Sequence, residues 1–548
     1  MSARGAEDPV AWPVLGGAEL ADIATFGQER ATEAGELLFR AGDAYCDLFV
    51  VLEGEVQVVR PDAAEEVVVA EFGPGGFVGE LALLTGQRRF LSGRVSQAGR
   101  VLAIEQEAFR RLMTQRPALG EVIFNALVAR REFLRSGQGA EAIRIIGSRY
   151  SPEAMSLRSF AEHARIAHTW TDLEEEEDVE LLLGRMGLGT QDTPVVVTPT
   201  GVLSRATSAT FAEYLGLTYQ PIPGYIFDLV VVGSGPAGLA AAVYGASEGL
   251  RTVSLDAVAI GGQAGSSSRI ENYAGFPNGI SGGDLTARAA VQALRLGARL
   301  NAPCEVVSLK VEKSFHIVGL RDGSEIPTRA VIVASGAHYQ RLPVENLERF
   351  EGAGVYYAAT DLEARVCGGG KVLVIGGGNS AGQAALYLSR NNCGVTLAIR
   401  RKDLLQTMSQ YLVERIDADP NIAVLTGVEV QALAGRDHLE QVTLRRLETA
   451  ELVTIDSAGL FCFIGARPAT QWLADAVLLD RDGFILTDRQ LSGAGEPDGF
   501  SPLPFETSAP GVFAAGDVRY GSMKRVAAAV GEGSSAVRSV HERLATMN

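Results

Sequence analysis

No two of the five cysteines in this 548-residue sequence are close enough to form a CxxC pair. Neighbouring cysteines of that kind carry dithiol redox chemistry or bind zinc. Their absence excludes a relay of adjacent protein thiols, and we expect no metal site. We interpret all five as packing residues, because free cysteines are commonly buried as small hydrophobes. They are Cys46, Cys304, Cys367, Cys393 and Cys462.

The sequence also lacks an excess of positive charge, and it lacks long apolar runs. Its net charge of −17 argues against binding to nucleic acid, because phosphate contacts need clustered Lys and Arg. No apolar run approaches the roughly 18 residues that cross a bilayer. The first residues show no basic stretch followed by an apolar core. We therefore expect a cytoplasmic protein with no membrane partner.

Glycine, by contrast, is abundant along the whole chain. The 63 glycines and 47% hydrophobic residues indicate a globular protein with many tight turns, and the length allows several domains. We predict a β-roll followed by a helical stretch from Glu107 to Arg135, together at residues 14–136. A small α/β domain at 140–219 and two Rossmann-like α/β nucleotide-binding domains from residue 226 onward complete the expected multidomain fold.

A buried strand, a glycine-rich turn and a helix follow one another in FDLVVVGSGPAGLAAAVYG. Gly233, Gly235 and Gly238 have the GxGxxG spacing that lets a pyrophosphate approach the backbone at a helix N-terminus. The next strand ends at Asp256, which is placed to accept a hydrogen bond from ribose hydroxyls. The segment therefore predicts a dinucleotide site.

A second copy of this pattern occurs in KVLVIGGGNSAGQAALYLS. Its turn contains Gly376, Gly378, Asn379 and Ala381. The following strand ends in Arg400, Arg401 and Lys402 instead of an acid. Because cations pair with a 2′-phosphate and an acid would repel it, we expect this site to prefer NADPH over NADH.

With these motifs in order, residues 227 to 548 resemble the low-molecular-weight thioredoxin-reductase family of flavoproteins. Further matching segments are GGQ at 261–263, IENYAGFP, ASGA and GVFAAGDV. The resemblance implies FAD and NADPH as cofactors, a homodimer, and an NADPH domain at 342–459 inserted into an FAD domain of 226–341 and 460–548. It also implies FAD contacts from Gly262, Gln263, Asn272, Gly516 and Asp517.

One departure from that family changes the expected chemistry. Where such reductases carry CATC, this chain reads AATD, with Ala358 and Asp361 at the two cysteine positions. Neither residue carries electrons, so the flavin has no protein disulfide to reduce. We expect an NADPH-dependent FAD oxidoreductase that passes electrons directly to a ferredoxin-like carrier, a quinone, a disulfide or oxygen. Two alternatives stay open: a thiol or disulfide reductase using a partner's cysteines, and a non-catalytic sensor of NADPH or flavin redox state.

The N-terminal segment FVGELALLTGQRRFLSGRV resembles the signature of cyclic-nucleotide-binding domains. The resemblance implies a pocket at Gly79, Glu80, Arg89 and Ser92, with Glu80 on the ribose and Arg89 on the cyclic phosphate of an effector. Phe90 and Leu91 replace the family's small residues, and a bulky ring there would close the pocket. The alternative is a degenerate roll that serves as a docking or dimer surface.

Residues 140–219 resemble a glutaredoxin or thioredoxin fold. SPEA stands where a glutaredoxin has CPYC, so Ser151 and Ala154 replace both cysteines. The Thr193-Pro194 step matches the cis-proline position of the fold. The resemblance implies a redox module without redox groups, which favours a docking or spacer role.

Overall fold

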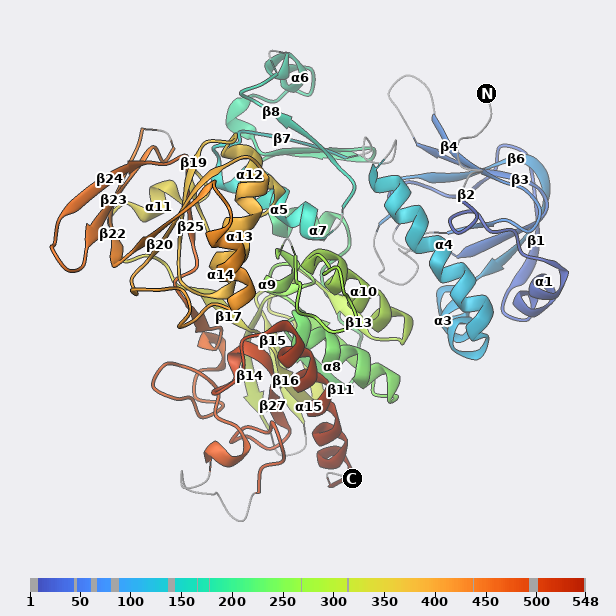
Figure 1. Ribbon diagram of the computed structural model, residues 1–548. Coiled ribbons are helices and arrows are strands. Elements are labelled where there is room, and N and C mark those ends of the chain that lie inside the picture. The colour runs from blue at the N-terminus through green and yellow to red at the C-terminus, as the bar shows by residue number, and fades with distance from the viewer. Residues whose placement is uncertain are drawn as a thin grey trace. The chain divides into compact units, whose positions relative to one another are not determined.

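The described residues fold as two compact units in the computed structural model (Figure 1). The first unit comprises residues 1–148, 160–219 and 294–299, and the second comprises 149–159, 220–293 and 300–548. Within these, the structure describes residues 8–43, 47–60, 67–79, 88–136, 143–164, 166–176, 178–267, 269–312, 315–436, 438–491 and 501–546.

The first unit begins with the predicted antiparallel β-roll. Its two 13-residue strands β3 and β6 pair along most of their length, and β1, β2, β4 and β5 add to them. Phe39, Phe49, Leu91 and Val95 pack in the core of the roll. The elements are α1 (Gly17–Ala24), β1 (Gln28–Thr32), β2 (Leu37–Phe39), β3 (Leu48–Arg60), β4 (Val67–Phe72), β5 (Phe77–Val78) and β6 (Ser92–Ile104).

Two helices follow the roll where the sequence predicts one helical stretch. They are α3 (Gln106–Gln115) and α4 (Pro117–Ser136). Pro117 has no N–H to donate and disfavours helical backbone at the residue before it. Arg116 accordingly adopts φ −127° and ψ 69°, and the helix breaks there.

A buried arginine ties α4 to the roll. Arg130 is 4% exposed, and its guanidinium donates hydrogen bonds to the carbonyls of Ala11 (2.7 Å) and Phe77 (2.8 Å). The rings of Trp12, Phe72 and Phe77 lie within 5.0 Å of it, so it also makes cation–π contacts. Burial lowers the pKa of Arg130 to about 9.

The small α/β sheet of the first unit has the strand order β10-β9-β7-β8. β7 pairs parallel with β8 and antiparallel with β9, and the Thr193-Pro194 peptide is cis, as expected. The sequence did not predict β8, because TWTD is short and largely polar. The elements are β7 (Arg144–Gly147), α5 (Pro152–His163), β8 (Thr169–Asp172), α6 (Val179–Arg185), η2 (Thr190–Asp192), β9 (Val195–Thr198), β10 (Gly201–Leu203) and α7 (Ser208–Tyr214).

The first large sheet of the second unit has the order β13-β12-β11-β16-β15-β14, with β27 also pairing with β16. β11 is parallel to β12 and β16, and β27 is parallel to β16 although it comes from the far end of the chain. The elements are β11 (Phe227–Val232), α8 (Pro236–Ser247), β12 (Thr252–Leu255), α9 (Gly262–Gly265), α10 (Gly282–Arg295), β13 (Arg299–Asn301), β14 (Val306–Val311), β15 (His316–Leu320), β16 (Glu325–Val333), η4 (Asp488–Leu491), β27 (Val512–Ala514), η5 (Gly516–Val518) and α15 (Val526–Thr546).

A second parallel sheet has the order β18-β25-β19-β20-β21. In the sequence, its strands come between β16 and β27 of the first large sheet. An antiparallel sheet, β22-β23-β24, follows it, and the β17-β26 pair joins the two domains. The elements are β17 (Ala337–Tyr339), α11 (Leu347–Phe350), β18 (Val355–Tyr356), α12 (Asp361–Val366), β19 (Lys371–Ile375), α13 (Asn379–Arg390), β20 (Gly394–Ile399), α14 (Gln410–Asp417), β21 (Ile422–Thr426), β22 (Val428–Ala434), β23 (Gln441–Arg446), β24 (Leu452–Asp456), β25 (Gly459–Cys462), β26 (Ala466–Pro468) and η3 (Gln471–Leu473). Because β25 belongs to this sheet, the chain leaves the inserted domain after Cys462 instead of at residue 460.

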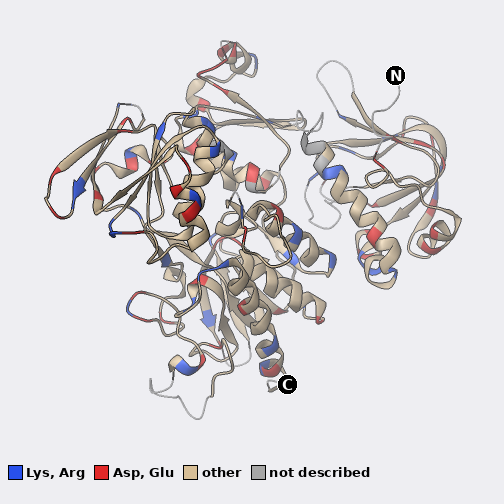
Figure 2. Cartoon of the chain, in the orientation of Figure 1, with Lys and Arg blue, Asp and Glu red and all other residues tan. Residues whose placement is uncertain are grey.

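Acidic and basic residues are interspersed along the elements instead of one sign gathering on a single element (Figure 2). Among the helices that the structure describes, none combines the length and the apolar character needed to cross a bilayer.

Candidate functional site

The first glycine-rich turn connects β11 to α8 and accepts no larger residue at two positions. Gly233 has φ +106°, and a Cβ added there would lie 2.2 Å from the carbonyl oxygen of Ala334. A Cβ on Gly238 would lie 1.8 Å from the carbonyl oxygen of Gly233. Gly235 is the N-cap of α8 and has no side chain to cap it. No side chain therefore caps the first N–H groups of α8, which is the arrangement that a phosphate-binding helix N-terminus needs.

The GGQ segment packs directly on this turn. Gly262 has φ +55°, and an added Cβ would lie 2.8 Å from Cα of Gly235. The N–H of Gly261 donates to the carbonyl of Ser234 at 2.8 Å, and the Gln263 side chain donates to the carbonyl of Ala337. Segments that the resemblance assigned to one flavin site thus lie side by side.

The C-terminal GD motif reaches the same place from the other end of the chain. Gly516 has φ +77°, and a Cβ there would lie 2.9 Å from Cβ of Ala237 in the first turn of α8. In α15, a Cβ on Gly533 would lie 2.0 Å from the carbonyl oxygen of Ala237. Asp517 follows in η5, and burial raises the pKa of its carboxyl group.

Asp256 orders the backbone beside this cradle. Its Oδ2 accepts from the N–H of Ser234 (2.7 Å), and its Oδ1 accepts from those of Val258 (3.0 Å) and Ala259 (3.2 Å). Burial raises the pKa of Asp256, and these three N–H groups act in the opposite direction. One lone pair of Oδ2 is left for a ribose hydroxyl, so the expected role is compatible with the backbone role. Asn272 lies in an exposed bend.

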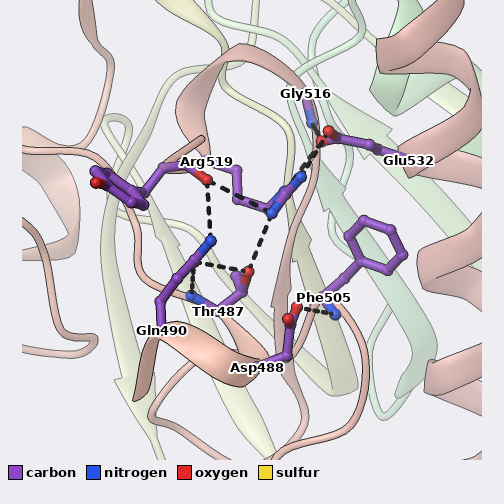
Figure 3. Close-up of polar contacts among 8 residues, drawn as sticks. Thr487, Asp488, Gln490, Phe505, Gly516, Arg519 and Glu532 are labelled. Atoms are coloured by element: carbon purple, nitrogen blue, oxygen red, sulfur yellow. Dashed lines mark hydrogen bonds and ion pairs between the residues drawn. The ribbon is translucent and has the colours of Figure 1, made fainter. Parts of the chain in front are cut away.

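A partly buried ion pair, which the sequence did not predict, holds the GD turn. Glu532 of α15 accepts from the N–H of Gly516 at 2.8 Å and from Nη2 of Arg519 at 2.7 Å (Figure 3). The Arg519 and Glu532 side chains are 15% and 13% exposed. Arg519 also approaches the hydroxyl of Thr487 at 3.5 Å. The one signal in the sequence was a glutamate within the apolar run VAAAVGEG.

The second glycine-rich turn connects β19 to α13. Gly376 has φ +132°, and a Cβ there would lie 2.2 Å from the carbonyl oxygen of Phe463. Gly378 is the N-cap of α13 and borders open space, while Ala381 is fully buried. The geometry again leaves a helix N-terminus accessible to a phosphate.

Asn379 has a role in the fold that differs from the expected ligand contact. Its Oδ1 accepts from the N–H of Ser409 at 2.7 Å, and its Nδ2 donates to the Ser409 hydroxyl at 3.0 Å. Both ends of the amide are thus used to join the start of α13 to the start of α14. Asn379 therefore shapes the turn, and its amide keeps one N–H and one oxygen lone pair beyond these two hydrogen bonds.

A cavity of about 990 Å³ opens next to this turn. Its volume is at the upper end of the range for small-molecule sites, which suits a ligand as large as a dinucleotide. Arg400 and Arg401 line it, together with residues from the connections between the two domains. These connecting residues are His338, Tyr339, Gln340, Arg341, Leu342, Pro343, Phe463, Ile464, Arg467 and Gln471.

The roll of the first unit contains a second, separate candidate site around Arg89. This side chain is 2% exposed, its guanidinium lies 4.4 Å from the centre of the Phe39 ring, and its Nη1 has no hydrogen-bond partner in the described part of the chain. A Cβ on Gly93 would lie 2.4 Å from the Phe39 ring, so that glycine sets the position of the ring. A buried cationic nitrogen without a partner suits an anionic ligand.

The other residues expected in the cyclic-nucleotide pocket differ in their positions and contacts. The Ser92 hydroxyl accepts from the N–H of Ala41 at 3.0 Å, Gly79 follows β5, and Glu80 lies outside the described residues. Leu91 packs in the core of the roll, so of the two bulky residues only the half-buried Phe90 stays a candidate for closing the pocket.

Comparison with known proteins finds matches for the β-roll of the first unit and for most of the second unit. Residues 227–533 match the family model described as pyridine nucleotide-disulphide oxidoreductase, and residues 29–116 match that of the cyclic nucleotide-binding domain. The thioredoxin reductase of Treponema pallidum (strain Nichols) is 33% identical over 322 residues, which cover 59% of this chain and 98% of that protein. The chain belongs to the pyridine nucleotide-disulphide oxidoreductase family.

Solved thioredoxin reductases have the same fold as this family member. The T. acidophilum enzyme is 30% identical with a TM-score of 0.53, and it covers 58% of this chain and 98% of its own. The Lactococcus lactis enzyme in its FR conformation is 29% identical with a TM-score of 0.52, and it covers 58% and 99%. The chain is thus a thioredoxin-reductase-like flavoprotein oxidoreductase that uses FAD and NADPH, fused to an N-terminal cyclic nucleotide-binding domain.

The thiols of this oxidoreductase are buried wherever the structure describes them. Cys304, Cys367, Cys393 and Cys462 are buried, and Cys46 lies outside the described residues. Burial raises the pKa of Cys367 and of Cys462 to about 12. Ala358 lies in the loop before α12, and Asp361 is the first residue of that helix. These described thiols are therefore poor nucleophiles at neutral pH.

Proposed function

We propose that this protein oxidises NADPH and passes the electrons from its flavin directly to an external acceptor, without a redox-active disulfide of its own. The observation that carries the proposal is the pair Ala358 and Asp361 at the positions of the family's two cysteines. The buried state of Cys304, Cys367, Cys393 and Cys462 supports it, because none of them replaces the missing pair.

The residues of the chain act by binding and placement. FAD, when bound, accepts a hydride from NADPH and delivers electrons to an acceptor. The turn at Gly233 to Gly238 would hold the FAD pyrophosphate, and Gly516 would bring the GD turn to it. The turn at Gly376 to Gly378 would hold the NADPH pyrophosphate, with the 2′-phosphate at Arg400 and Arg401.

Anaerobic stopped-flow spectroscopy of the FAD-loaded protein tests this proposal. We expect NADPH to bleach the flavin, and the reduced protein to be reoxidised rapidly by one class among a ferredoxin, a quinone, a small disulfide and oxygen. Blocking all accessible thiols with N-ethylmaleimide should leave both rates unchanged. Loss of reoxidation after this treatment would favour a thiol reductase instead, and bleaching without reoxidation by any acceptor would favour a redox sensor.

A second proposed function is binding of a cyclic mononucleotide, which regulates the oxidoreductase, at the N-terminal domain. It rests on the Nη1 of Arg89, which is buried beside Phe39 and has no protein partner within the described ranges. A cyclic phosphate would supply the missing acceptor and neutralise the buried charge.

Calorimetric titration with cyclic AMP and cyclic GMP tests this second function. Arg89→Gln should abolish the binding heat, whereas Arg88→Gln, at an exposed neighbour, should preserve it. The rate of NADPH oxidation with and without the nucleotide then measures regulation. No heat with the unmodified protein would instead support a roll that serves only as a docking surface.

A further inference from the structure

One acidic residue, Glu429, lies next to arginines in the lining of the cavity beside the second glycine-rich turn. Glu429, the second residue of β22, lines the cavity together with Arg400 and Arg401. Its Oε2 lies 3.8 Å from Nε of Arg400. The sequence predicted NADPH because β20 ends in basic residues instead of an acid. In the fold, however, Glu429 of the neighbouring antiparallel sheet places an acid next to those basic residues.

The hairpin register holds this acid in place. Glu429 pairs directly with Arg445 across β22 and β23. Nε of Arg445 donates to Oε1 of Glu429 at 3.1 Å, and Nη2 of Arg445 donates to the same oxygen. Oε1 thus faces Arg445, while Oε2 is left facing Arg400. The Arg400 side chain is 75% exposed, so little besides Glu429 restrains it.

The charge of Glu429 affects a 2′-phosphate in two ways. It attracts Arg400, a cation that the phosphate needs, and it repels the phosphate itself. The first effect acts over the 3.8 Å between Glu429 and Arg400, well within the screening length of about 8 Å at physiological ionic strength. NADH has a neutral 2′-hydroxyl where NADPH has the 2′-phosphate. The charge of Glu429 therefore weakens the binding of NADH less than that of NADPH.

We propose that Glu429 is a specificity-determining residue that weakens the preference of this site for NADPH over NADH, and that Arg445 limits this effect. Arg445 neutralises the carboxylate and keeps one of its oxygens turned away from Arg400. The inference rests on the proposed position of the 2′-phosphate at Arg400 and Arg401. Coenzyme preference then depends on the balance of charge among these four side chains.

Glu429→Gln tests the first half of the proposal in the full-length, FAD-loaded protein. Calorimetry with adenosine 2′,5′-bisphosphate and 5′-AMP measures the preference for the 2′-phosphate without any redox chemistry. We expect the ratio of the two affinities to rise about fivefold, or about 1 kcal/mol. The ratio of flavin-reduction efficiencies with NADPH and NADH should rise in parallel. The matched control is Glu451→Gln, which removes an exposed carboxylate paired with Arg446 in the turn between β23 and β24.

Arg445→Gln tests the second half of the proposal, that Arg445 limits the effect of Glu429. It should change the affinity ratio in the opposite direction to Glu429→Gln. Without its partner, Glu429 becomes free to bind Arg400, so the preference for the 2′-phosphate should fall severalfold. Arg446→Gln, one residue along the strand, is the control. An unchanged or lower ratio in Glu429→Gln, or an unchanged or higher ratio in Arg445→Gln, overturns the inference. If the unmodified protein binds neither probe and neither coenzyme bleaches its flavin, the proposed function fails as well.

Discussion

Glu532 and Arg519 form an ion pair of 2.7 Å that joins α15 to the turn after the GD motif. The same carboxylate accepts the N–H of Gly516, so side chain and backbone of one turn converge on one acid. Removing one partner of a pair that is mostly withdrawn from solvent leaves a charge without its partner, which destabilises more than the pair itself stabilises. The pair therefore fixes the turn after the GD motif to α15.

Arg519→Gln should destabilise the FAD-binding domain by about 3 kcal/mol and lower the FAD content of the purified protein. FAD per chain after dialysis, measured by absorbance, checks the result. Arg538→Gln is the matched control on α15, because Arg538 forms an exposed i,i+4 pair with Glu542. That variant should change stability by less than about 0.5 kcal/mol. Equal FAD loss in both variants would contradict a role for the buried pair.

Gly533→Ala should also weaken FAD binding, because its Cβ would lie 2.0 Å from the carbonyl oxygen of Ala237. Helices α8 and α15 would have to move apart, at a cost of about 1 to 3 kcal/mol. Gly531→Ala is the control in the same helix, where an added Cβ meets nothing within 4 Å. It should be neutral or stabilising by up to about 1 kcal/mol, because alanine favours the helix. Thermal release of FAD, followed by flavin fluorescence, distinguishes the two variants.

His316 predicts acid sensitivity of the same domain. It is fully buried in β15, and burial lowers its pKa to about 4. Between its ordinary pKa of about 6.5 and about 4, the unfolded chain binds a proton that the folded chain does not. Stability should therefore fall as the pH falls through this range, by about 3 kcal/mol from this residue.

The midpoint of thermal FAD release, measured from pH 7 to pH 4 in His316→Gln and in the unmodified protein, isolates this contribution. The variant should lose less stability on acidification. Identical pH profiles for the two proteins would show that His316 is protonated without cost in the folded state.

The thiols should react slowly until the protein unfolds. With pKa values of about 12 for Cys367 and Cys462, less than about 0.1% of these groups is thiolate at pH 8. In a Cys46→Ser variant, Ellman's reagent should label almost no thiol in the native state and all four remaining cysteines in guanidinium chloride. Rapid native labelling of Cys367, identified by mass spectrometry, would show that α12 opens readily.

The two glycine-rich turns were predictable from sequence, because contacts below 2.5 Å at Gly233, Gly238 and Gly376 leave no alternative residue. Contacts between segments that are distant in the sequence could not be predicted. Nothing in the sequence pairs Glu532 with Arg519, and nothing sets Glu429 opposite Arg445, because each depends on helix packing or strand register. The motif predicted a ligand contact for Asn379, but not the two hydrogen bonds that its amide makes with Ser409 across 30 residues of sequence. Pro117 is a signal for a helix break, but the apolar residues on both sides of it have helical spacing. The sequence therefore predicted one continuous helical stretch.

The flavin cradle is assembled from two segments separated by an entire inserted domain. Gly238 is synthesised before the inserted domain, whereas Gly516, Arg519 and Glu532 are synthesised after it. During translation of the inserted domain, the nascent chain therefore has only the first of the two segments. Flavin should load only after α15 has been made, and a chain that ends before Gly516 should emerge colourless however well its earlier domains have folded.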